Sequence, residues 1–298
     1  MLALVDGDVV TYQCGFASDQ TIYTAPDGAE FQYKKEAVQH CLDHKLDEND
    51  IAKNVEPEPV EHCLHSVKIF INSMLHEIDA DEKKIFLTGG GQRRVDIFPE
   101  YKANRDETHK PYWYSEIHQY LQETHGADMI IGEEADDAMA WHQWADKATR
   151  DGDQLGAETC ICTIDKDLNM VPGFHYNWKA NGGKGDLFWV DETVANRLFF
   201  EQWLSGDTAD NIPGIPGVGP IKAQKILAGV GDDPFLMYEK VINEWSGPPV
   251  VASAPACQSV EEYVHLIGDL LWMQRVPGET WDQHFGLTDL RNDNECLF

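Results

Sequence analysis

The chain has 298 residues, of which 42% are apolar and 10% aromatic. These proportions fit one large globular domain or two modest ones, and they exclude disordered, collagen-like and coiled-coil proteins. The 52 acidic and 23 basic residues give a net charge of −29. A general nucleic-acid-binding surface is normally basic, so any such binding here must depend on local clusters of cations.

Cysteine usage and hydropathy indicate the compartment. The seven cysteines form no CxxC pair and have no regular spacing, which favours reduced thiols over a disulfide framework. The first ten residues lack a basic segment, and no apolar run approaches the roughly 20 residues that span a membrane. We therefore expect a cytoplasmic protein that is neither exported nor inserted into a membrane.

Strand and helix patterns alternate along the N-terminal half. A short apolar run ends at Asp6, and Asp8 is expected to cap the helix that follows. The expected elements, in chain order, are a strand over 2–5, a hairpin joining 21–24 to 30–33, helices over 35–47 and 60–78, a strand over 84–88, a helix over 111–125, a strand over 128–131, a helix over 133–149, a strand over 159–164 and a hairpin joining 174–178 to 187–190. This alternation predicts a mainly parallel central sheet flanked by helices.

The pattern becomes helical near residue 191, around a Pro/Gly-rich stretch over 211–219. We expect an α/β core over 1–190 and a helical subdomain over 191–298. The subdomain would contain a hairpin over 211–220 and a final segment that wraps the surface.

Carboxylates gather at the ends of predicted elements. Glu134, Asp136 and Asp137 open a helix on which residues three apart share a face. The alternative interpretation is that these acids only exploit the positive end of the helix dipole, which stabilises negative charge at a helix N-terminus. Further acids follow strands or precede the Pro/Gly-rich stretch: Asp6, Asp165, Asp167, Asp207 and Asp210. Hard oxygen ligands at strand ends suit Mg²⁺ or Mn²⁺ rather than zinc.

The Pro/Gly-rich stretch has the features of a phosphate site. Gly214, Gly217 and Gly219 permit a tight turn and close approach of the backbone. Lys222 and Lys225 follow on a helix whose N-terminus offers free N–H groups. A helix–hairpin–helix binds a nucleic-acid backbone in this way, and an ordinary Pro/Gly loop is the alternative.

Cations and aromatics also cluster ahead of the helix expected over 111–125. Lys102 and Arg105 are three apart, so on a helix they would form one cationic face able to hold a phosphate, with Tyr101 free to stack on a base. Taken individually, Arg94 and Lys110 fit solvated surface cations better.

Five motifs, taken in order, resemble those of the 5′ nuclease superfamily of flap endonucleases and 5′–3′ exonucleases. They are VDGD, PEYKANRDE, EEADD, TIDKDL and GDTADNIPGIPGVGPIKAQKIL, which run from about residue 3 to 228. The length and the DGD start are most similar to the free-standing exonucleases of short-tailed bacteriophages.

The resemblance implies a PIN-like nuclease core with an arch, or clamp, over about 92–120, and a helix–hairpin–helix of the helix-3-turn-helix kind. It implies two Mg²⁺ or Mn²⁺ ions held by the eight acids named above, and a potassium ion at the hairpin turn. Lys102 and Arg105 would neutralise the scissile phosphate, and Tyr101 would stack on an unpaired base. The hairpin glycines, with Lys222 and Lys225, would anchor the duplex.

The expected activity is that of an exodeoxyribonuclease that digests duplex DNA from a free 5′ end and releases 5′-phosphorylated products. Flap endonuclease and RNase H activities are further expectations, so flaps and RNA–DNA hybrids join duplex DNA as partners of a monomeric chain. Primer removal, recombination and degradation of host DNA all fit. Two alternatives stay open: an endonuclease that cuts flaps internally, and a catalytically impaired protein that binds DNA ends.

One position departs from the family. At the end of the second strand, where the family usually places a metal-binding aspartate, this chain has Thr88 followed by Gly89. Asp8, Asp96 and a bridging water are the candidates to compensate. Reduced metal affinity or rate, or loss of activity, would follow if none of them does.

Overall fold

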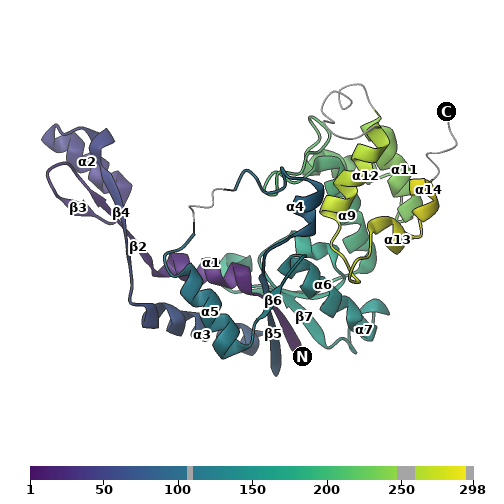
Figure 1. Cartoon of the computed structure of the whole chain (residues 1–298), viewed down its shortest axis with the longest axis horizontal. Coiled ribbons are helices and arrows are strands. Elements are labelled where there is room, and N and C mark those ends of the chain that lie inside the picture. Colours follow the sequence, from purple (N-terminus) through teal and green to yellow (C-terminus); the bar gives the residue numbers. More distant parts are fainter. Residues whose placement is uncertain (106–109, 247–258, 293–298) are drawn as a thin grey trace.

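Strands rich in buried apolar residues build a central sheet (Figure 1). The computed structural model describes residues 1–105, 110–246 and 259–292. Within them the sheet has the strand order β6-β5-β1-β7-β8-β9. Its strands are β1 (Leu2–Asp6), β5 (Glu82–Thr88), β6 (Asp128–Ile130), β7 (Thr159–Cys162), β8 (Gly173–Asn177) and β9 (Asp186–Val190). Neighbouring strands are parallel except β8 and β9, which confirms the expected mainly parallel sheet.

Strand β1 is buried on both faces. Ala3 and Val5 contribute to one hydrophobic cluster and Leu4 to another, as the two-residue period of a strand requires. The register places Asp6 opposite Phe86, close to the carboxyl end of β5. The carboxyl ends of the parallel strands therefore meet at one edge of the sheet.

Three helices cover one face of this sheet: α1 (Gly7–Ser18), α3 (Val60–Glu77) and α5 (Tyr114–His125). In α3, Val67, Ile71 and Met74 recur at helical spacing and are buried. The helix expected over 60–78 is thereby confirmed. Helix α5 begins three residues later than expected, at Tyr114.

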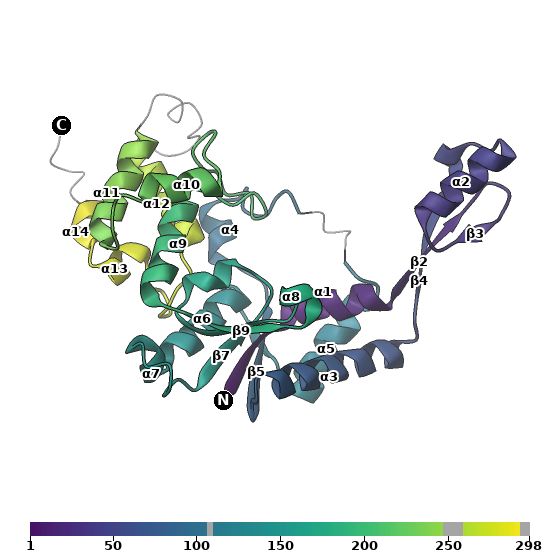
Figure 2. The ribbon, with the colours of Figure 1, turned by 180° about the vertical axis from the view of Figure 1, so that it is seen from behind.

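Helix α6 and the C-terminal helices cover the opposite face (Figure 2). Apart from one helix in the arm described below, the helices outside the first layer are α4 (Arg93–Ile97), α6 (Ala135–Ala145), α7 (Lys147–Arg150), α8 (Ala180–Gly183), α9 (Glu192–Ser205), α10 (Pro220–Leu227), α11 (Pro234–Trp245), α12 (Val260–Leu271), α13 (Trp281–Phe285) and α14 (Thr288–Asn292), with a 3₁₀ turn η2 (Asp167–Met170). One buried cluster runs from Leu4 through Met139 to Trp203 and Trp281. The C-terminal region is helical, as expected, and it shares this core with the sheet. No helix in the described ranges has the length and apolar character needed to cross a bilayer.

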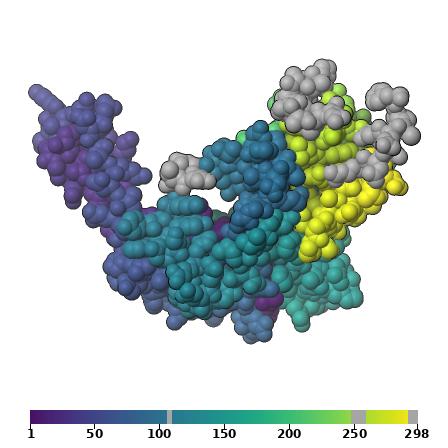
Figure 3. All heavy atoms as spheres, viewed as in Figure 1, coloured from purple at the N-terminus to yellow at the C-terminus, as the bar shows by residue number. Residues whose placement is uncertain are grey.

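A small unit, here called the arm (residues 19–57), projects from the first helical layer (Figures 1 and 3). It contains β2 (Asp19–Thr24), β3 (Glu30–Phe31), α2 (Lys34–His44), the 3₁₀ turn η1 (Glu48–Asp50) and β4 (Ala52–Pro57), with sheet order β3-β2-β4. The hairpin and helix expected here are confirmed, whereas β4 was not predicted. The ring N–H of Trp113 donates to the carbonyl of Glu58 at 2.8 Å, and this bond ties the base of the arm to the start of α5.

Two local expectations were wrong because residues other than those expected cap the helices. Asp6, not Asp8, caps α1, since its carboxylate accepts the N–H of Val9 at 2.9 Å. The helix expected over 133–149 is broken at Asp146, whose carboxylate accepts the N–H of Ala148 at 3.0 Å and starts α7.

Candidate active site

Carboxylates from several elements meet at the carboxyl edge of the sheet. Asp6 ends β1, Asp165 follows β7, and Glu134 and Asp136 lie at the start of α6, which packs on β1, β5 and β7. A cavity of about 20 Å³ lies among them, lined by Arg94, Tyr101, Glu134, Asp136, Asp165, Asp167, Gln202, Asp207, Asp210, Ile212, Leu270, Leu271 and Met273. A space of this size holds about one water molecule or one ion.

The acids on the β1 and β7 side of this cavity repel one another. Burial, followed by the charges of Asp8 and Asp165, raises the pKa of Asp6 to about 7. Burial and then the charges of Asp6 and Asp165 raise the pKa of Asp136 well above its usual range. The pKa of Asp167 rises to about 8 because of burial, the charge of Asp165 and contact with Asp207. Carboxylates crowded in this way need positive charge to ionise together.

A divalent cation fits this set of side chains. The donors are carboxylate oxygens, which Mg²⁺ and Mn²⁺ prefer, and their raised pKa values show a shortage of positive charge. Among the described residues, no three His, Cys, Asp or Glu side chains are already closed around one ion position.

The other side of the cavity is neutralised by cations. Arg94 is only 2% exposed and bonds both Nη1 and Nη2 to the carboxylate of Asp137, with Nη2 to Oδ1 at 3.0 Å. The backbone N–H of Gln274 donates to the same carboxylate at 3.1 Å, so Asp137 is completely buried and does not line the cavity. The expectation that Asp137 is a metal ligand is therefore corrected: Glu134 and Asp137 do share a face, but that face meets Arg94.

Arg94 is the largest departure from the sequence-based interpretation, which made it a solvated surface residue. Its Nε donates to the carbonyl of Leu270 at 2.9 Å and its Nη2 to that of Trp272 at 2.8 Å. Its Nη1 donates to Glu134 Oε2 at 3.2 Å. These partners lie 40 to 178 positions away, so no local pattern could have identified the role of this arginine.

Lys102 and Arg105 do reach the site, but they do so from a turn and not from a helix. Lys102 has a left-handed backbone with φ of 56°, and its N–H donates to the carbonyl of Asp210 at 2.9 Å. Its Nζ contacts a Glu134 carboxylate oxygen, and Arg105 contacts the carboxylate of Asp210. The helix considered for them is absent, yet both cations contact acids that line the cavity. Of the expected arch, residues 106–109 lie outside the described ranges.

Tyr101 is buried and cannot stack on a base in this structure. Its side chain belongs to the hydrophobic core and the residue is only 4% exposed. Its hydroxyl lies 2.8 Å from Glu134 Oε2 and 3.0 Å from Asp210 Oδ2, and it donates its proton to this pair. The expected stacking role is corrected to one of holding two carboxylates in place.

Sequence reasoning missed three further polar roles: two side chains orient the acids, and a third bonds the backbone at the start of the helix that carries Asp136. The hydroxyl of Thr163 donates to Asp6 Oδ2 at 2.7 Å, and the amide of Gln202 donates to both Asp167 and Asp207, at 3.1 and 2.8 Å. Thr88 Oγ1 accepts the N–H of Ala135 at 3.0 Å at the start of α6. Thr163 lies next to the TIDKDL acids in sequence, which was the only local signal for any of them.

The hairpin glycines have two different environments. A Cβ on Gly214 would lie 2.2 Å from the carbonyl oxygen of Ser205, so this glycine permits close packing of the chain against the end of α9. Gly217 has φ of 76°, and the space around Gly217 and Gly219 is open. Gly219 directly precedes α10. Lys222 and Lys225 are exposed on that helix, so the open part of the turn, and not Gly214, is the part that a phosphate could approach.

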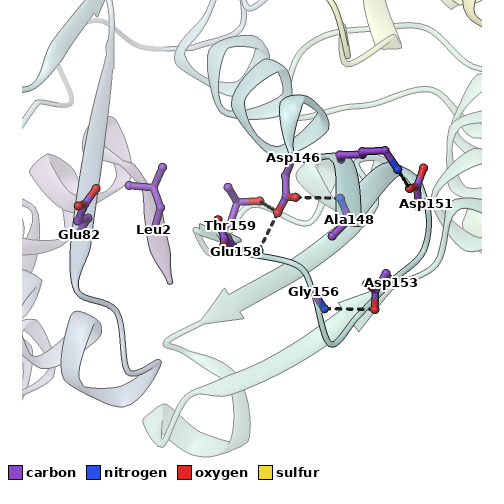
Figure 4. Close-up of a pocket in the computed structure, with 10 residues that line it drawn as sticks. Leu2, Glu82, Asp146, Ala148, Asp151, Asp153, Gly156, Glu158 and Thr159 are labelled. Carbon is purple, nitrogen blue, oxygen red and sulfur yellow. Dashed lines mark hydrogen bonds and ion pairs between the residues drawn. The ribbon is translucent and has the colours of Figure 1, made fainter.

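A larger cavity of about 720 Å³ lies at the opposite, amino edge of the sheet (Figure 4). Several acids line it, and three of them, Asp146, Asp151 and Asp153, have partners within the chain. Asp151 contacts Lys147, and Asp146 accepts N–H groups from Ala148 and Glu158. This cavity is separate from the acidic edge.

No protein-family model matches the chain. An exodeoxyribonuclease of Enterobacteria phage T3 is 25% identical over 224 residues, which are 74% of this chain and 66% of that protein. A flap endonuclease Xni of Shewanella piezotolerans is 28% identical over 45% of this chain and 53% of that protein. DNA polymerase I of Rhizobium leguminosarum is 29% identical over 47% of this chain, but the match spans only 14% of the polymerase.

Solved structures share the fold. A bacteriophage T5 protein co-crystallised with metal ions gives a TM-score of 0.53 at 16% identity, over 93% of this chain and 89% of that one. The T5 flap endonuclease, in a complex with DNA and metal ions, gives a TM-score of 0.51 at 13% identity, over 91% of this chain and 98% of that one. The fold is thus that of the phage 5′ nucleases. The sequence relatives carry the names of 5′ nucleases as well, so the resemblance to the 5′ nuclease superfamily seen in the motifs is confirmed.

Proposed function

We propose that this chain is a metal-dependent 5′–3′ exonuclease, which hydrolyses phosphodiester bonds from the 5′ ends of duplex DNA and releases 5′-phosphorylated products. The observation that carries the proposal is the meeting of mutually repelling carboxylates around one ion-sized cavity, with Lys102 and Arg105 in contact with two of its lining acids. Carboxylates short of positive charge attract divalent ions, and cations beside them attract a phosphate.

Two Mg²⁺ or Mn²⁺ ions would be held by the acids that line or adjoin the cavity: Asp6, Glu134, Asp136, Asp165, Asp167, Asp207 and Asp210. Ions bound there supply Lewis-acid activation of the attacking water and of the leaving 3′ oxygen. Thr163 and Gln202 hold three of these carboxylates in fixed directions through hydrogen bonds, which limits the reorganisation needed on binding.

Lys102 and Arg105 would bind the scissile phosphate. Arg105 is exposed over 56% of its side chain, and its partner Asp210 is also bonded by Tyr101, so Arg105 can turn to a phosphate without leaving that acid unpaired. An unpaired base would contact Tyr12 on α1 and Tyr114 on α5, whose ring centroids lie 5.6 Å apart in an edge-to-face arrangement. Both rings lie near Asp8: burial is the main cause that raises the pKa of each tyrosine, and the charge of Asp8 adds to it.

The hairpin would hold the duplex behind the site. Gly217 and Gly219 leave the backbone open at the start of α10, and Lys222 and Lys225 add positive charge there. A potassium ion at this turn, a monomeric chain and a location in the cytoplasm, of a host cell if a phage encodes the chain, belong to the same proposal. Action on flaps and on RNA–DNA hybrids does too.

The test is digestion of 5′-labelled and 3′-labelled duplexes, a flap and an RNA–DNA hybrid in Mg²⁺. The Asp165→Ala/Asp167→Ala variant removes two cavity acids, and Asp151→Ala/Asp153→Ala removes an equally spaced pair at the far edge of the sheet. We expect the chain and the second variant to release 5′-labelled mononucleotides or short oligonucleotides, and the first variant to release none. Activity in the first variant would contradict the proposed site.

A second candidate is a protein that binds DNA ends without cutting, and Gly89 favours it, since the chain leaving β5 carries no carboxylate of its own at that position. Retained end binding without cleavage by the unmodified chain in either Mg²⁺ or Mn²⁺ would support it against the proposal. Internal cuts near the base of a flap, with intact blunt duplex, would instead indicate an endonuclease specific for flaps.

A further inference from the structure

The end of β5 cannot carry a side chain at Gly89. A Cβ there would lie 2.4 Å from Cδ1 of Ile131 and 2.6 Å from the carbonyl oxygen of Ile130. The chain leaving β6 therefore occupies the space that an aspartate at position 89 would need. A carboxylate at this point of the sheet edge must come from another element.

Asp8, in the first turn of α1, reaches this point. Its Oδ2 accepts the backbone N–H of Thr88 at 3.0 Å, which fixes the carboxylate at the end of β5. Its Oδ1 is buried and accepts no hydrogen bond from the described residues. It lies near enough to Asp6, Glu134 and Lys102 to interact with their charges. A buried anionic oxygen without a partner is costly unless something binds it.

His118, on α5, faces the same oxygen. Its Nε2 lies 3.7 Å from Asp8 Oδ1, which is too long for a hydrogen bond, and this nitrogen is also buried without a hydrogen-bond partner among the described residues. Two unsatisfied polar atoms thus face each other beside the acidic cavity. Asp96, the other acid close in sequence, is exposed on α4, where Arg94 points inward.

We infer that Asp8 completes the ion site at the end of β5, with Oδ1 as the ligand atom and with Thr88 and His118 fixing its orientation. Asp8 thereby takes the place of a carboxylate on β5 itself. His118 is a positioning residue: its Nε2 faces Oδ1 across 3.7 Å without a hydrogen bond, so its influence on an ion would act only through Asp8. This inference rests on the proposed function because it concerns the same ions.

The test is Mn²⁺ binding measured by calorimetry in the absence of DNA. The proteins are the unmodified chain, Asp8→Asn, Asp96→Asn as the matched control, and Asp165→Asn. We expect Asp8→Asn to lose at least tenfold in affinity for one ion, a loss of about 1.4 kcal/mol, while Asp96→Asn binds like the unmodified chain. The amide oxygen of the asparagine can still accept the Thr88 N–H, so the fold should persist, as circular dichroism in EDTA would show.

Each outcome separates the inference from the proposed function. Unchanged Mn²⁺ binding by Asp8→Asn, with weakened binding by Asp165→Asn, overturns the inference and leaves the proposed site intact. Unchanged binding by Asp165→Asn removes the proposed site itself. If Asp8→Asn does not fold, Asp8→Glu serves instead: it keeps the charge but displaces the oxygen, and unaltered affinity would again overturn the inference.

The role of His118 has its own test in a double-mutant cycle. His118→Gln should weaken Mn²⁺ binding severalfold in the unmodified chain and have no effect in the Asp8→Asn background, because it acts only through that carboxylate. The Mn²⁺ electron paramagnetic resonance spectrum should change in the same dependent manner. Additive losses in the double variant would show that His118 does not act through Asp8.

Discussion

Replacing Arg94 by methionine should destabilise the protein strongly. Methionine preserves much of the length of the side chain and removes its charge and all its hydrogen bonds. The substitution leaves the carboxylates of Glu134 and Asp137, which are 4% and 0% exposed, without this cation. Breaking a buried pair in this way costs about 3–5 kcal/mol. The lost bonds to the carbonyls of Leu270 and Trp272 add about 1 kcal/mol each.

Urea unfolding in EDTA measures this loss, and Arg93→Met is its control. Arg93 is the neighbouring arginine, but its pair with Glu133 is partly exposed, at 29% and 18% of the two side chains, so its replacement should cost about 1 kcal/mol or less. A loss for Arg94→Met no larger than that for Arg93→Met would refute the reasoning.

The pH dependence of the same experiment gives a second check. Burial alone would raise the pKa of Glu134, but the charges of Arg94 and Lys102 outweigh it and lower the pKa below 4.5. A lowered pKa means that the pair stabilises the fold above pH 4.5 and that this stabilisation disappears as the pH falls through the folded value. The difference between the unmodified chain and Arg94→Met should therefore shrink below pH 4.5. A difference that does not vary with pH would exclude an ionic origin.

Three other predictions concern the acids and the hairpin. The pKa of Asp167 is raised from 3.8 to about 8, so its ionisation lowers the stability of the fold as the pH rises between these values. Thermal unfolding in EDTA should therefore show Asp167→Asn to be more stable than the unmodified chain above pH 8 and equally stable below pH 4. Gly219→Ala should leave the melting temperature unchanged but weaken duplex binding, whereas Gly214→Ala should lower the melting temperature because its Cβ meets backbone atoms. A larger fall in melting temperature for Gly219→Ala than for Gly214→Ala would contradict the assigned environments. Lys222→Ala/Lys225→Ala should reduce the slope of log affinity against log salt by about 2 for duplex DNA, and an unchanged slope would exclude phosphate contacts by these lysines.

The sequence predicted those elements whose own pattern of apolar residues reflects their burial. Strands β1 and β7 are short apolar runs because parallel strands at the centre of a sheet are covered on both faces. Strand β4 was not predicted, since its residues are mostly exposed and it exists only through pairing with β2, as between Val55 and Thr21. The short helix α4 likewise depends on contacts from outside its five residues, made through Arg94.

The candidate site was predictable in its residue types but not in its assignments. Asp136 and Asp137 are adjacent acids on one helix turn, and only the rotation of that helix against the cavity and Arg94 decides which one faces an ion. Tyr101 is of a residue type that can stack on a base, but its buried hydroxyl is hydrogen-bonded to Glu134 and Asp210, which are 33 and 109 positions away in the sequence. Gly214 differs from its fellow hairpin glycines only through its packing on α9.

The order of synthesis gives the bond between Asp137 and Gln274 a further meaning. These residues are 137 positions apart, and a ribosome adding about 5–20 residues per second needs roughly 7–27 s to pass from one to the other. During that interval Arg94 lacks its two carbonyl partners, and Asp137 lacks the backbone N–H that completes its coordination. The buried network beside the acidic edge can therefore close only after the C-terminal helices have emerged. A nascent chain thus contains these carboxylates well before the contacts that orient them can form.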